Sequence, residues 1–227
     1  MRRIWRERDE VRQHRAPGFR VALTFDTEHP EFDADPSNTL RLLDVLAHEQ
    51  AVATFFLQGQ WASSRPSLAR RIAEDGHLIG SHSQWHVPHT SLTESGLRDS
   101  VKRAEASITA TTGVDPRPWF RCPYGQGIRE RRVRRILGDL GYVNVAWDVE
   151  PYDFRPGIQP EHVAERAVSG SVAHGDGARV LLHNWPDATL AALPMILSGL
   201  SKAGARLVRL DSLPTPPGAP RAVTKHG

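Results

Sequence analysis

The stretch RVALTFDTEH, residues 20–29, combines the pattern of a buried strand with a group of polar side chains at its end. Residues 20–25 form an almost continuous apolar run, which is typical of a strand covered on both faces of a parallel sheet. Asp26, Glu28 and His29 follow directly. A carboxylate in this place either caps the next loop or takes part in chemistry. Two acids within three residues favour chemistry, because one can bind a cation while the other accepts a proton from water.

Short β-type runs alternate with helical stretches along the rest of the chain. The expected strands are residues 20–25, 52–57, 77–80, 118–121, 142–147, 180–182 and 206–210. The expected helices are residues 39–49, 66–74, 92–110, 128–140, 161–168 and 188–203. The capping box Ser91-Leu-Thr-Glu94 is expected to begin the third of these helices. Strands separated by helices predict an α/β fold with a mainly parallel sheet, closed into a barrel or open and doubly wound.

Composition excludes several classes of protein. A single cysteine, Cys122, cannot form an internal disulfide or a thiolate zinc cluster, and it is interpreted as a small buried residue. No run of 18 apolar residues predicts a membrane span. The chain has neither a G-x-G-x-x-G nor a Walker motif, so nucleotide binding lacks its usual marker. Seven arginines against three acids in residues 1–20 account for the positive net charge of +3.

Three regions follow from these patterns. Residues 1–19 form a basic arm, residues 20–212 form one folded domain, and the Pro/Gly-rich residues 213–227 are expected to be a disordered tail. The arm lacks the aromatic interleaving of a single-strand-binding segment, so no nucleic-acid partner is expected. The first 16 residues contain no apolar run as long as that of a secretory signal, which predicts a cytoplasmic location.

Polar motifs follow five of the expected strands at the point where each strand ends. They are DTEH (26–29), HSQWH (82–86), RCPYG (121–125), WDVEPYD (147–153) and HNW (183–185). In parallel α/β folds the C-terminal ends of the strands share one rim, and this rim carries the chemistry. The motifs are therefore expected to meet at one site.

Histidines and carboxylates in these motifs suit metal binding and proton transfer. His82 and His86 are four residues apart, a spacing at which two imidazoles can reach one cation, although a buried structural pair is the alternative. Arg121 placed beside Asp26 would keep that carboxylate ionised. His183 is a structural histidine when alone, but with Asp153 to hold its proton it can act as a general acid.

Aromatic residues lie beside four of the motifs. They are Trp85, Trp119, Trp147 and Trp185. Aromatic walls suit the apolar faces of sugar rings, and core filling is the alternative interpretation, which we favour for Trp147. His89 is interpreted as an outer neighbour of the site or as an exposed residue.

Taken together, the motifs resemble those of the NodB-like polysaccharide deacetylases, a family of metal-dependent carbohydrate esterases. TFDTE (24–28), HSQWH (82–86), RCPYG (121–125), WDVEPYD (147–153) and LLH (181–183) occur in the family's order, within a resemblance that spans residues 21–210. The resemblance implies the NodB-homology fold, a distorted (β/α)7 barrel. It also implies removal of an N-acetyl group from an amino sugar, in a polymer, an oligosaccharide or a soluble glycoconjugate, with release of acetate.

The resemblance assigns catalytic roles residue by residue. Asp26 matches the catalytic base, and Arg121 matches the arginine that pairs with it. His183 matches the general acid, and Asp153 the acid that tunes it. Tyr124 matches the residue whose backbone N–H stabilises the oxyanion, on the Pro-Tyr-Gly turn where such a donor is usually built. Tyr124, Trp85 and Trp185 are the expected substrate-binding residues.

The first motif departs from the common family pattern, in which two acids are adjacent and the second binds the metal. Thr27 occupies that position here, and a threonine hydroxyl is a poor zinc ligand. Some branches of the family place the ligand acid one residue later, which fits Glu28. The resemblance therefore implies a Glu28–His82–His86 site for a divalent cation, zinc in first place, with cobalt, nickel or manganese as alternatives.

Two other functions stay open on the same scaffold. One is hydrolysis of a non-sugar or cyclic amide, and the other is carbohydrate binding by a catalytically inactive member. In each case the expected partner is a small molecule or glycan, an N-acetylated carbohydrate in the main interpretation, with no nucleic acid and no membrane span. Retention of Asp26, both histidines, Arg121 and His183 argues against the inactive alternative.

Overall fold

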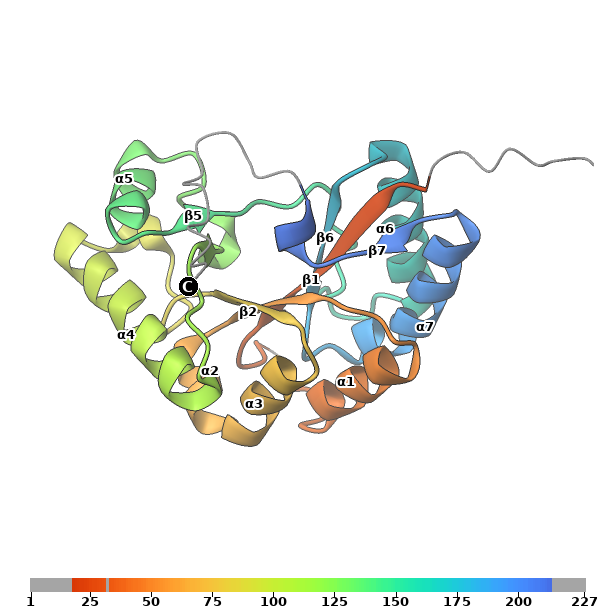
Figure 1. The fold of residues 1–227 in the computed structure, drawn as a ribbon, viewed down its shortest axis with the longest axis horizontal. Helices are drawn as coiled ribbons and strands as arrows, with labels where there is room; N and C mark the ends of the chain where they lie inside the picture. Colours follow the sequence, from red (N-terminus) through yellow and green to blue (C-terminus); the bar gives the residue numbers. More distant parts are fainter. Residues whose placement is uncertain (1–17, 32, 214–227) are drawn as a thin grey trace, which may run out of the picture.

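A seven-stranded parallel sheet forms the centre of the protein (Figure 1). The computed structural model describes residues 18–31 and 33–213. The strands are β1 (Arg20–Thr27), β2 (Thr54–Leu57), β3 (Leu78–Ser81), β4 (Trp119–Phe120), β5 (Val143–Asn144), β6 (Ala178–His183) and β7 (Arg206–Leu207). They pair in the order β5-β4-β3-β2-β1-β6, while β7 pairs with the first two residues of β1.

The sheet curls toward closure through the segment that follows β5. Val149 forms a parallel bridge with Val180 of β6, so the chain crosses from the β5 edge to the β6 edge. Short edge strands and the insertion of β7 beside the beginning of β1 make the barrel irregular. This is the distorted (β/α)7 barrel that the motifs implied, and the predicted fold is confirmed.

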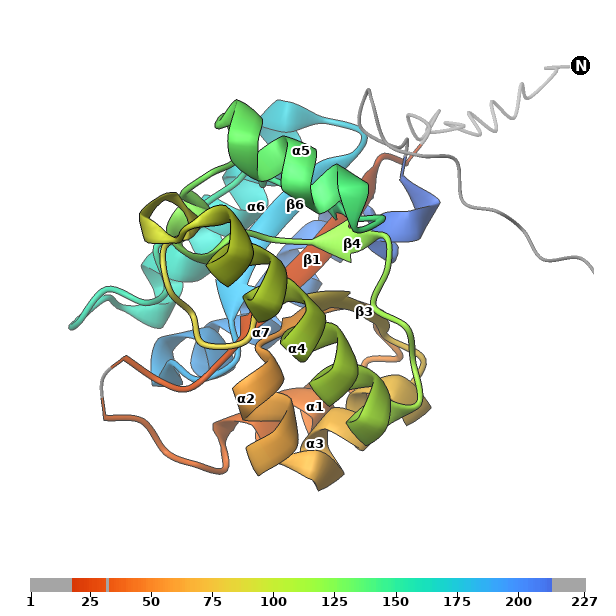
Figure 2. The same ribbon diagram turned by 90° about the vertical axis from the view of Figure 1, so that its left-hand side faces the viewer.

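Helices cover the outer face of the curled sheet (Figures 1 and 2). They are α1 (Asn38–His48), α2 (Gly59–Ser64), α3 (Pro66–Glu74), α4 (Glu94–Thr112), α5 (Arg131–Asp139), α6 (Pro160–His174) and α7 (Asp187–Lys202), with short 3₁₀ turns at η1 (His89–Ser91), η2 (Pro123–Gly125) and η3 (Leu210–Ser212). The main core lies between these helices and one face of β1, β2 and β6, from which Leu23, Phe25, Phe55 and Leu182 are fully buried. Burial of this apolar face supplies the main driving force for the fold.

The opposite face of the sheet is closed by a second, smaller cluster. Because side chains alternate along a strand, Ala22 and Phe56 point away from the main core, and they pack with Val208 and Leu210 near η3. This cluster fills part of the interior of the barrel. The polar motifs lie at the carboxyl ends of the strands.

One local prediction was wrong, and one short helix was not predicted. Thr93, not Ser91, caps α4: its hydroxyl oxygen accepts the backbone N–H of Gly96 at 3.1 Å, whereas the Ser91 hydroxyl donates to the carbonyl of Pro88 at 2.7 Å. The chain turns through η1 first, which moves the start of the helix by two residues. The six-residue helix α2 was not expected, because its sequence GQWASS has no side-chain cap and follows β2 almost directly.

The basic arm and the tail stay predictions, since residues 1–17 and 214–227 lie outside the described part of the chain. Across the described helices, none is both long enough and apolar enough to cross a membrane.

Candidate active site

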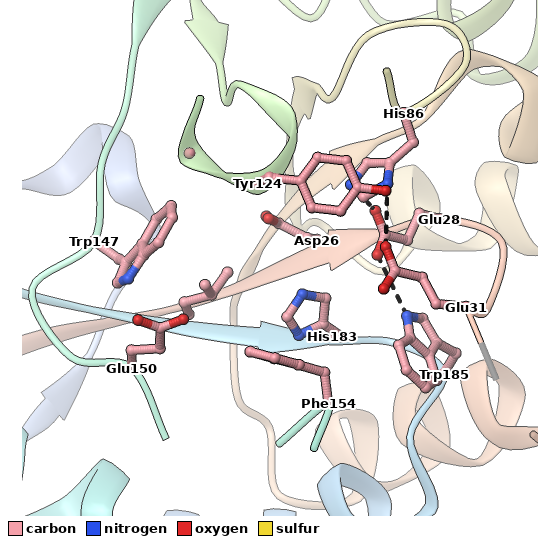
Figure 3. A pocket seen from close by; sticks show the side chains of 12 residues that line it. Asp26, Glu28, Glu31, His86, Tyr124, Trp147, Glu150, Phe154, His183 and Trp185 are labelled. Carbon is pink, nitrogen blue, oxygen red and sulfur yellow. Dashed lines mark hydrogen bonds and ion pairs between the residues drawn. The ribbon is translucent and has the colours of Figure 1, made fainter. Parts of the chain in front are cut away.

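A small cavity opens where the carboxyl ends of the strands meet (Figure 3). Its volume is about 190 Å³. It is lined by Asp26, Glu28, Glu31, His86, Tyr124, Gly125, Trp147, Glu150, Phe154, Leu181, His183 and Trp185. All five polar motifs contribute side chains to the lining of this cavity. Four of them lie on β1, on β6 and in the loops after β3 and β4. The fifth contributes Trp147 and Glu150 from the segment that crosses from β5 to β6.

Strand alternation explains the departure in the first motif. Asp26 and Glu28 are two residues apart at the end of β1 and both face the cavity. Thr27 points the other way: it is fully buried and its hydroxyl donates to the carbonyl of Phe25 at 3.3 Å. Its side chain therefore does not face the cavity, and the second acid of this site is Glu28.

Glu28, His82 and His86 form a cluster with the composition of a metal site. Oε2 of Glu28 lies 2.6 Å from Nε2 of His86 and 3.3 Å from Nε2 of His82. The three candidate ligand atoms lie within 4.8 Å of one another. Burial on its own would raise the pKa of Glu28, but hydrogen bonds and charge from the two histidines lower it, so the carboxylate is ionised.

Buried atoms in this cluster fit a divalent cation. Nδ1 of His82 lies 2.9 Å from the carbonyl oxygen of Arg121, which can only accept, so Nδ1 carries a proton and Nε2 is the ring nitrogen directed at Glu28. That Nε2 atom and Oε2 of Glu28 are both buried, and among the described residues the polar atoms that contact Oε2 are the ring nitrogens of the two histidines. A histidine held through one ring nitrogen is the usual arrangement of a metal ligand, and a mixed His/carboxylate set suits zinc.

Asp26 is fixed by a buried arginine. Nη1 of Arg121 donates to Oδ1 of Asp26 at 2.8 Å, while Nε of Arg121 donates to the carbonyl of Val145 at 3.3 Å. The guanidinium is fully buried and stacks over the ring of Phe56, 4.2 Å from its centre. The second oxygen of Asp26 lies 3.6 Å from Nε2 of His82, so it faces the cluster of Glu28, His82 and His86.

His183 lies directly across from Asp26, because these two residues are register partners on β6 and β1. Nδ1 of His183 contacts Oδ1 of Asp153 at 2.9 Å. Burial would lower the pKa of His183, but the charge and hydrogen bond of Asp153 raise it to about 9. The histidine is therefore protonated at neutral pH and its Nε2 is available to the cavity.

The tyrosine and tryptophans occupy different positions around the cavity. Tyr124 adopts a left-handed conformation with φ of 55°, and its ring packs at a tilt of 47° against the ring of His86, with 4.4 Å between ring centres. Trp185 is a buried wall of the cavity. Trp85 does not line it; this residue is half exposed and lies under the guanidinium of Arg103. The oxyanion role of the Tyr124 N–H stays a prediction.

Two interpretations based on residue type were wrong. Trp147, expected to fill the core, is partly exposed and lines the cavity. For His89 only the exposed alternative was wrong: this residue is fully buried against Phe120, with 5.3 Å between ring centres. Burial, together with the charges of the neighbouring His82 and His86, lowers the pKa of His89 to about 3. This histidine is a neutral core residue.

Sequence reasoning missed three residues that line the cavity, namely Glu31, Glu150 and Phe154. Glu31 is three residues beyond Glu28, and its carboxylate lies 3.7 Å from Nδ1 of His86. Burial and the Glu31 carboxylate raise the pKa of the Tyr124 phenol to about 12, so this hydroxyl stays a donor toward Glu31. Glu150 lies within the WDVEPYD motif and Phe154 directly after it, so this motif was the sequence signal that could have indicated both residues.

The fold and this arrangement of carboxylates, histidines and an arginine define a class of hydrolases that place a cation-binding cluster beside an acid–base pair. The family model described as polysaccharide deacetylase matches residues 13–145. The chain therefore belongs to the polysaccharide deacetylase family, which confirms the resemblance and the reaction class predicted from the motifs.

Particular relatives agree with this membership. The chain is 30% identical over 197 residues to a peptidoglycan-N-acetylglucosamine deacetylase of Bacillus cereus, covering 85% of this chain and 67% of that protein. It spans only 38% of the length of three other curated relatives. A family 4 carbohydrate esterase from Streptomyces lividans in complex with acetate is 30% identical with a TM-score of 0.73, over 84% of this chain and 92% of that chain. A family 4 pseudoenzyme from Bacillus anthracis is 25% identical with a TM-score of 0.76, over 86% of this chain and 65% of that chain.

Proposed function

We propose that this protein removes the N-acetyl group from an amino sugar of a glycan, with a divalent cation, zinc in first place, held by Glu28, His82 and His86. The observation that carries the proposal is the placement of Asp26 and His183 on neighbouring strands beside that cluster, in one cavity. Hydrolysis of an amide needs a base to activate water and an acid to protonate the leaving nitrogen, and these two residues lie side by side in the wall of the cavity.

A cation in the cluster would supply Lewis acidity to the acetamide carbonyl and to the attacking water. The protein supplies the remaining groups. Glu28 contributes an ionised oxygen, while His82 contributes Nε2, whose orientation is set by the hydrogen bond of Nδ1 to the carbonyl of Arg121. His86 contributes the third ligand atom, 2.6 Å from the same carboxylate oxygen.

Asp26 is the proposed base. Arg121 holds one of its oxygens at 2.8 Å and leaves the other directed toward His82. Arg121 thereby fixes the orientation of the carboxylate that would accept a proton from water. Transfer of that proton to Oδ2 would form the nucleophile beside the acetamide carbon.

His183 is the proposed acid. Its raised pKa, about 9, keeps the imidazolium protonated at neutral pH. Asp153 retains the proton on Nδ1, so the proton on Nε2 is the one donated to the departing amine. Collapse of the tetrahedral intermediate then yields acetate and the free amino sugar.

Aromatic side chains form the walls that would receive the sugar. Trp147, Phe154 and Trp185 line the cavity, and such rings pack well against the apolar faces of a pyranose. A second hollow of about 290 Å³ shares Phe154 and Trp185 with the first. Two adjoining hollows support an oligosaccharide or polymer as the substrate in preference to a single sugar.

The relatives narrow the candidate glycans. The Bacillus cereus relative is named for peptidoglycan N-acetylglucosamine, so an N-acetylglucosamine-containing glycan is our first choice of substrate. A soluble amino-sugar conjugate is the alternative. Carbohydrate binding without catalysis is a second candidate function, favoured by the pseudoenzyme among the structural neighbours.

A substrate panel tests the proposal. The purified full-length protein is assayed for acetate release from N-acetylglucosamine oligosaccharides, peptidoglycan fragments and a cyclic amide, with the metal content measured in the same sample. Acetate release from the oligosaccharides, lost in Asp26→Asn, supports the proposal. Glycan binding without acetate release would favour the binding function, and turnover of the cyclic amide alone would favour the amidase alternative.

A further inference from the structure

We propose that Trp185 is a positioning residue of the metal centre, whose indole N–H fixes the Glu28 carboxylate so that its second oxygen faces His82 and His86. This inference rests on the proposed cation site. It gives Trp185 a role beyond the wall that it forms in the cavity. It also explains how Glu28 can act as the metal ligand, although in the common family pattern this ligand is the acid directly after the catalytic base.

The two oxygens of Glu28 have different neighbours (Figure 3). Nε1 of Trp185 donates to Oε1 at 3.4 Å. Oε2 is the atom that lies 2.6 Å from His86 and 3.3 Å from His82. The indole therefore contacts the oxygen that is not directed at the histidines. Both Trp185 and Glu28 are buried, with 6% and 2% of their surface exposed, so water competes little for this hydrogen bond.

The backbone of Glu28 is held from the same segment. β1 ends at Thr27, and the next N–H, that of Glu28, donates to Oδ1 of Asn184 at 3.1 Å. The N–H of Asn184 donates in turn to the carbonyl of Asp26 at 3.3 Å. Residues 184 and 185 thus hold Glu28 at both its main chain and its side chain.

Trp185 is itself anchored. Nδ2 of Asn38, the first residue of α1, donates to the carbonyl of Trp185 at 2.8 Å. The indole therefore projects from a fixed backbone. A glutamate has one more rotatable bond than an aspartate, so more side-chain freedom must be lost when it binds a cation. A donor that fixes the carboxylate in advance reduces that cost, as outer-shell hydrogen bonds do in known metal sites.

Zinc affinity tests the inference directly. The metal-free full-length protein is titrated with zinc against a chromophoric chelator, as wild type, Trp185→Phe and the matched control Trp147→Phe. We expect Trp185→Phe to bind zinc about 10- to 100-fold more weakly, the range found for loss of outer-shell partners. Trp147 lines the same cavity without contacting Glu28 in any described interaction, so its variant should retain the wild-type affinity.

A second variant separates the hydrogen bond from packing. Replacing Trp185 alone by 3-benzothienylalanine keeps the bicyclic shape and exchanges the N–H for sulfur. The same loss of zinc affinity, with an unchanged melting temperature of the metal-free protein, supports the positioning role. Wild-type zinc affinity in both Trp185 variants would overturn it and leave the proposed function standing. Absence of tight zinc binding in the wild type would overturn the cation site itself.

Discussion

The Asp153 carboxylate holds His183 at two points: Oδ1 contacts the ring Nδ1 at 2.9 Å, and Oδ2 accepts the backbone N–H at 2.7 Å. Thr189 of α7 donates a further hydrogen bond to Oδ2 at 2.6 Å. With 2% of its surface exposed, Asp153 is screened little by solvent. The pair therefore fixes both the tautomer and the charge of the histidine, and the pH dependence of the reaction should follow from it.

Replacement of Asp153 by Asn should move the alkaline limb of the pH–rate profile. A general acid works in its protonated form, so kcat/KM should fall as pH rises through the His183 pKa of about 9. Without the aspartate charge, burial lowers the pKa and the limb should move toward or below the ordinary histidine value of about 6.5. Thr189→Val, which keeps the charge, should move it much less. An unmoved limb in Asp153→Asn would contradict this assignment.

Loss of either proposed proton-transfer group should abolish most of the activity. Asp26→Asn and His183→Ala are each expected to slow turnover by about 100- to 10,000-fold, the usual contribution of a positioned acid or base. Circular dichroism of both variants should match the wild type. Near-normal turnover in either variant would remove that residue from the mechanism.

Metal binding should depend on Glu28 and not on Thr27. Glu28→Ala removes the carboxylate oxygen that lies nearest both histidines, so the purified variant should lose most of its bound metal. Thr27→Val is the matched control, because this side chain points away from the cavity and, among the residues that the structure describes, its hydroxyl bonds the carbonyl of Phe25 alone. Elemental analysis of the two variants compares them, and full metal retention in Glu28→Ala would exclude the proposed ligand set.

Breaking the buried pair of Arg121 and Asp26 should destabilise the protein. Arg121→Met leaves a nearly buried carboxylate without its partner, which typically costs about 3–5 kcal/mol of unfolding free energy. Adding Asp26→Asn removes that charge and should restore part of the stability. Urea unfolding of the metal-free proteins measures both effects. If Arg121→Met alone were as stable as the wild type, the ion pair with Arg121 would not be needed to hold the buried Asp26 carboxylate.

Glu150 should bind the substrate without taking part in proton transfer. No described residue forms a hydrogen bond or ion pair with its carboxylate, which lines the cavity beside Trp147 and Phe154 (Figure 3). Glu150→Ala is expected to raise KM about 10-fold with little change in kcat. The variant loses one charged hydrogen bond to the substrate, and this bond would be made equally in the ground state and in the transition state. A fall in kcat with an unchanged KM would assign it to the chemical step.

The sequence was informative where strands end. Asp26, His82, Arg121 and His183 each follow a short apolar run, and parallel strands deliver their carboxyl ends to one rim. The meeting of these motifs at one rim could therefore be predicted from order and spacing, whereas the set of Glu28 with both histidines and the pairing of Asp26 with Arg121 were implied by the family resemblance. The i, i+2 relation of Asp26 and Glu28 also follows from the alternation of side chains along a strand.

The loops could not be predicted in the same way. Ser83 and His86 adopt positive φ angles, of 64° and 51°, in the segment after β3, and the resulting turn directs Trp85 toward α4 and away from the cavity. Trp147 joined the cavity because the segment after β5 crosses to β6, a long-range pairing that no local pattern indicates. Glu31 lies in the loop after β1, where neither helical nor strand periodicity places a side chain.

Acetate release as a function of zinc content tests the central claim most directly. The wild-type protein is stripped of metal, supplied with an N-acetylglucosamine pentasaccharide and titrated with zinc, with Glu28→Ala treated in parallel. We predict no acetate from the stripped protein, recovery of release as zinc approaches one equivalent, and no recovery in Glu28→Ala. Full release by the stripped protein, or glycan binding without acetate at any zinc concentration, would contradict a cation-dependent deacetylase built on Glu28, His82 and His86.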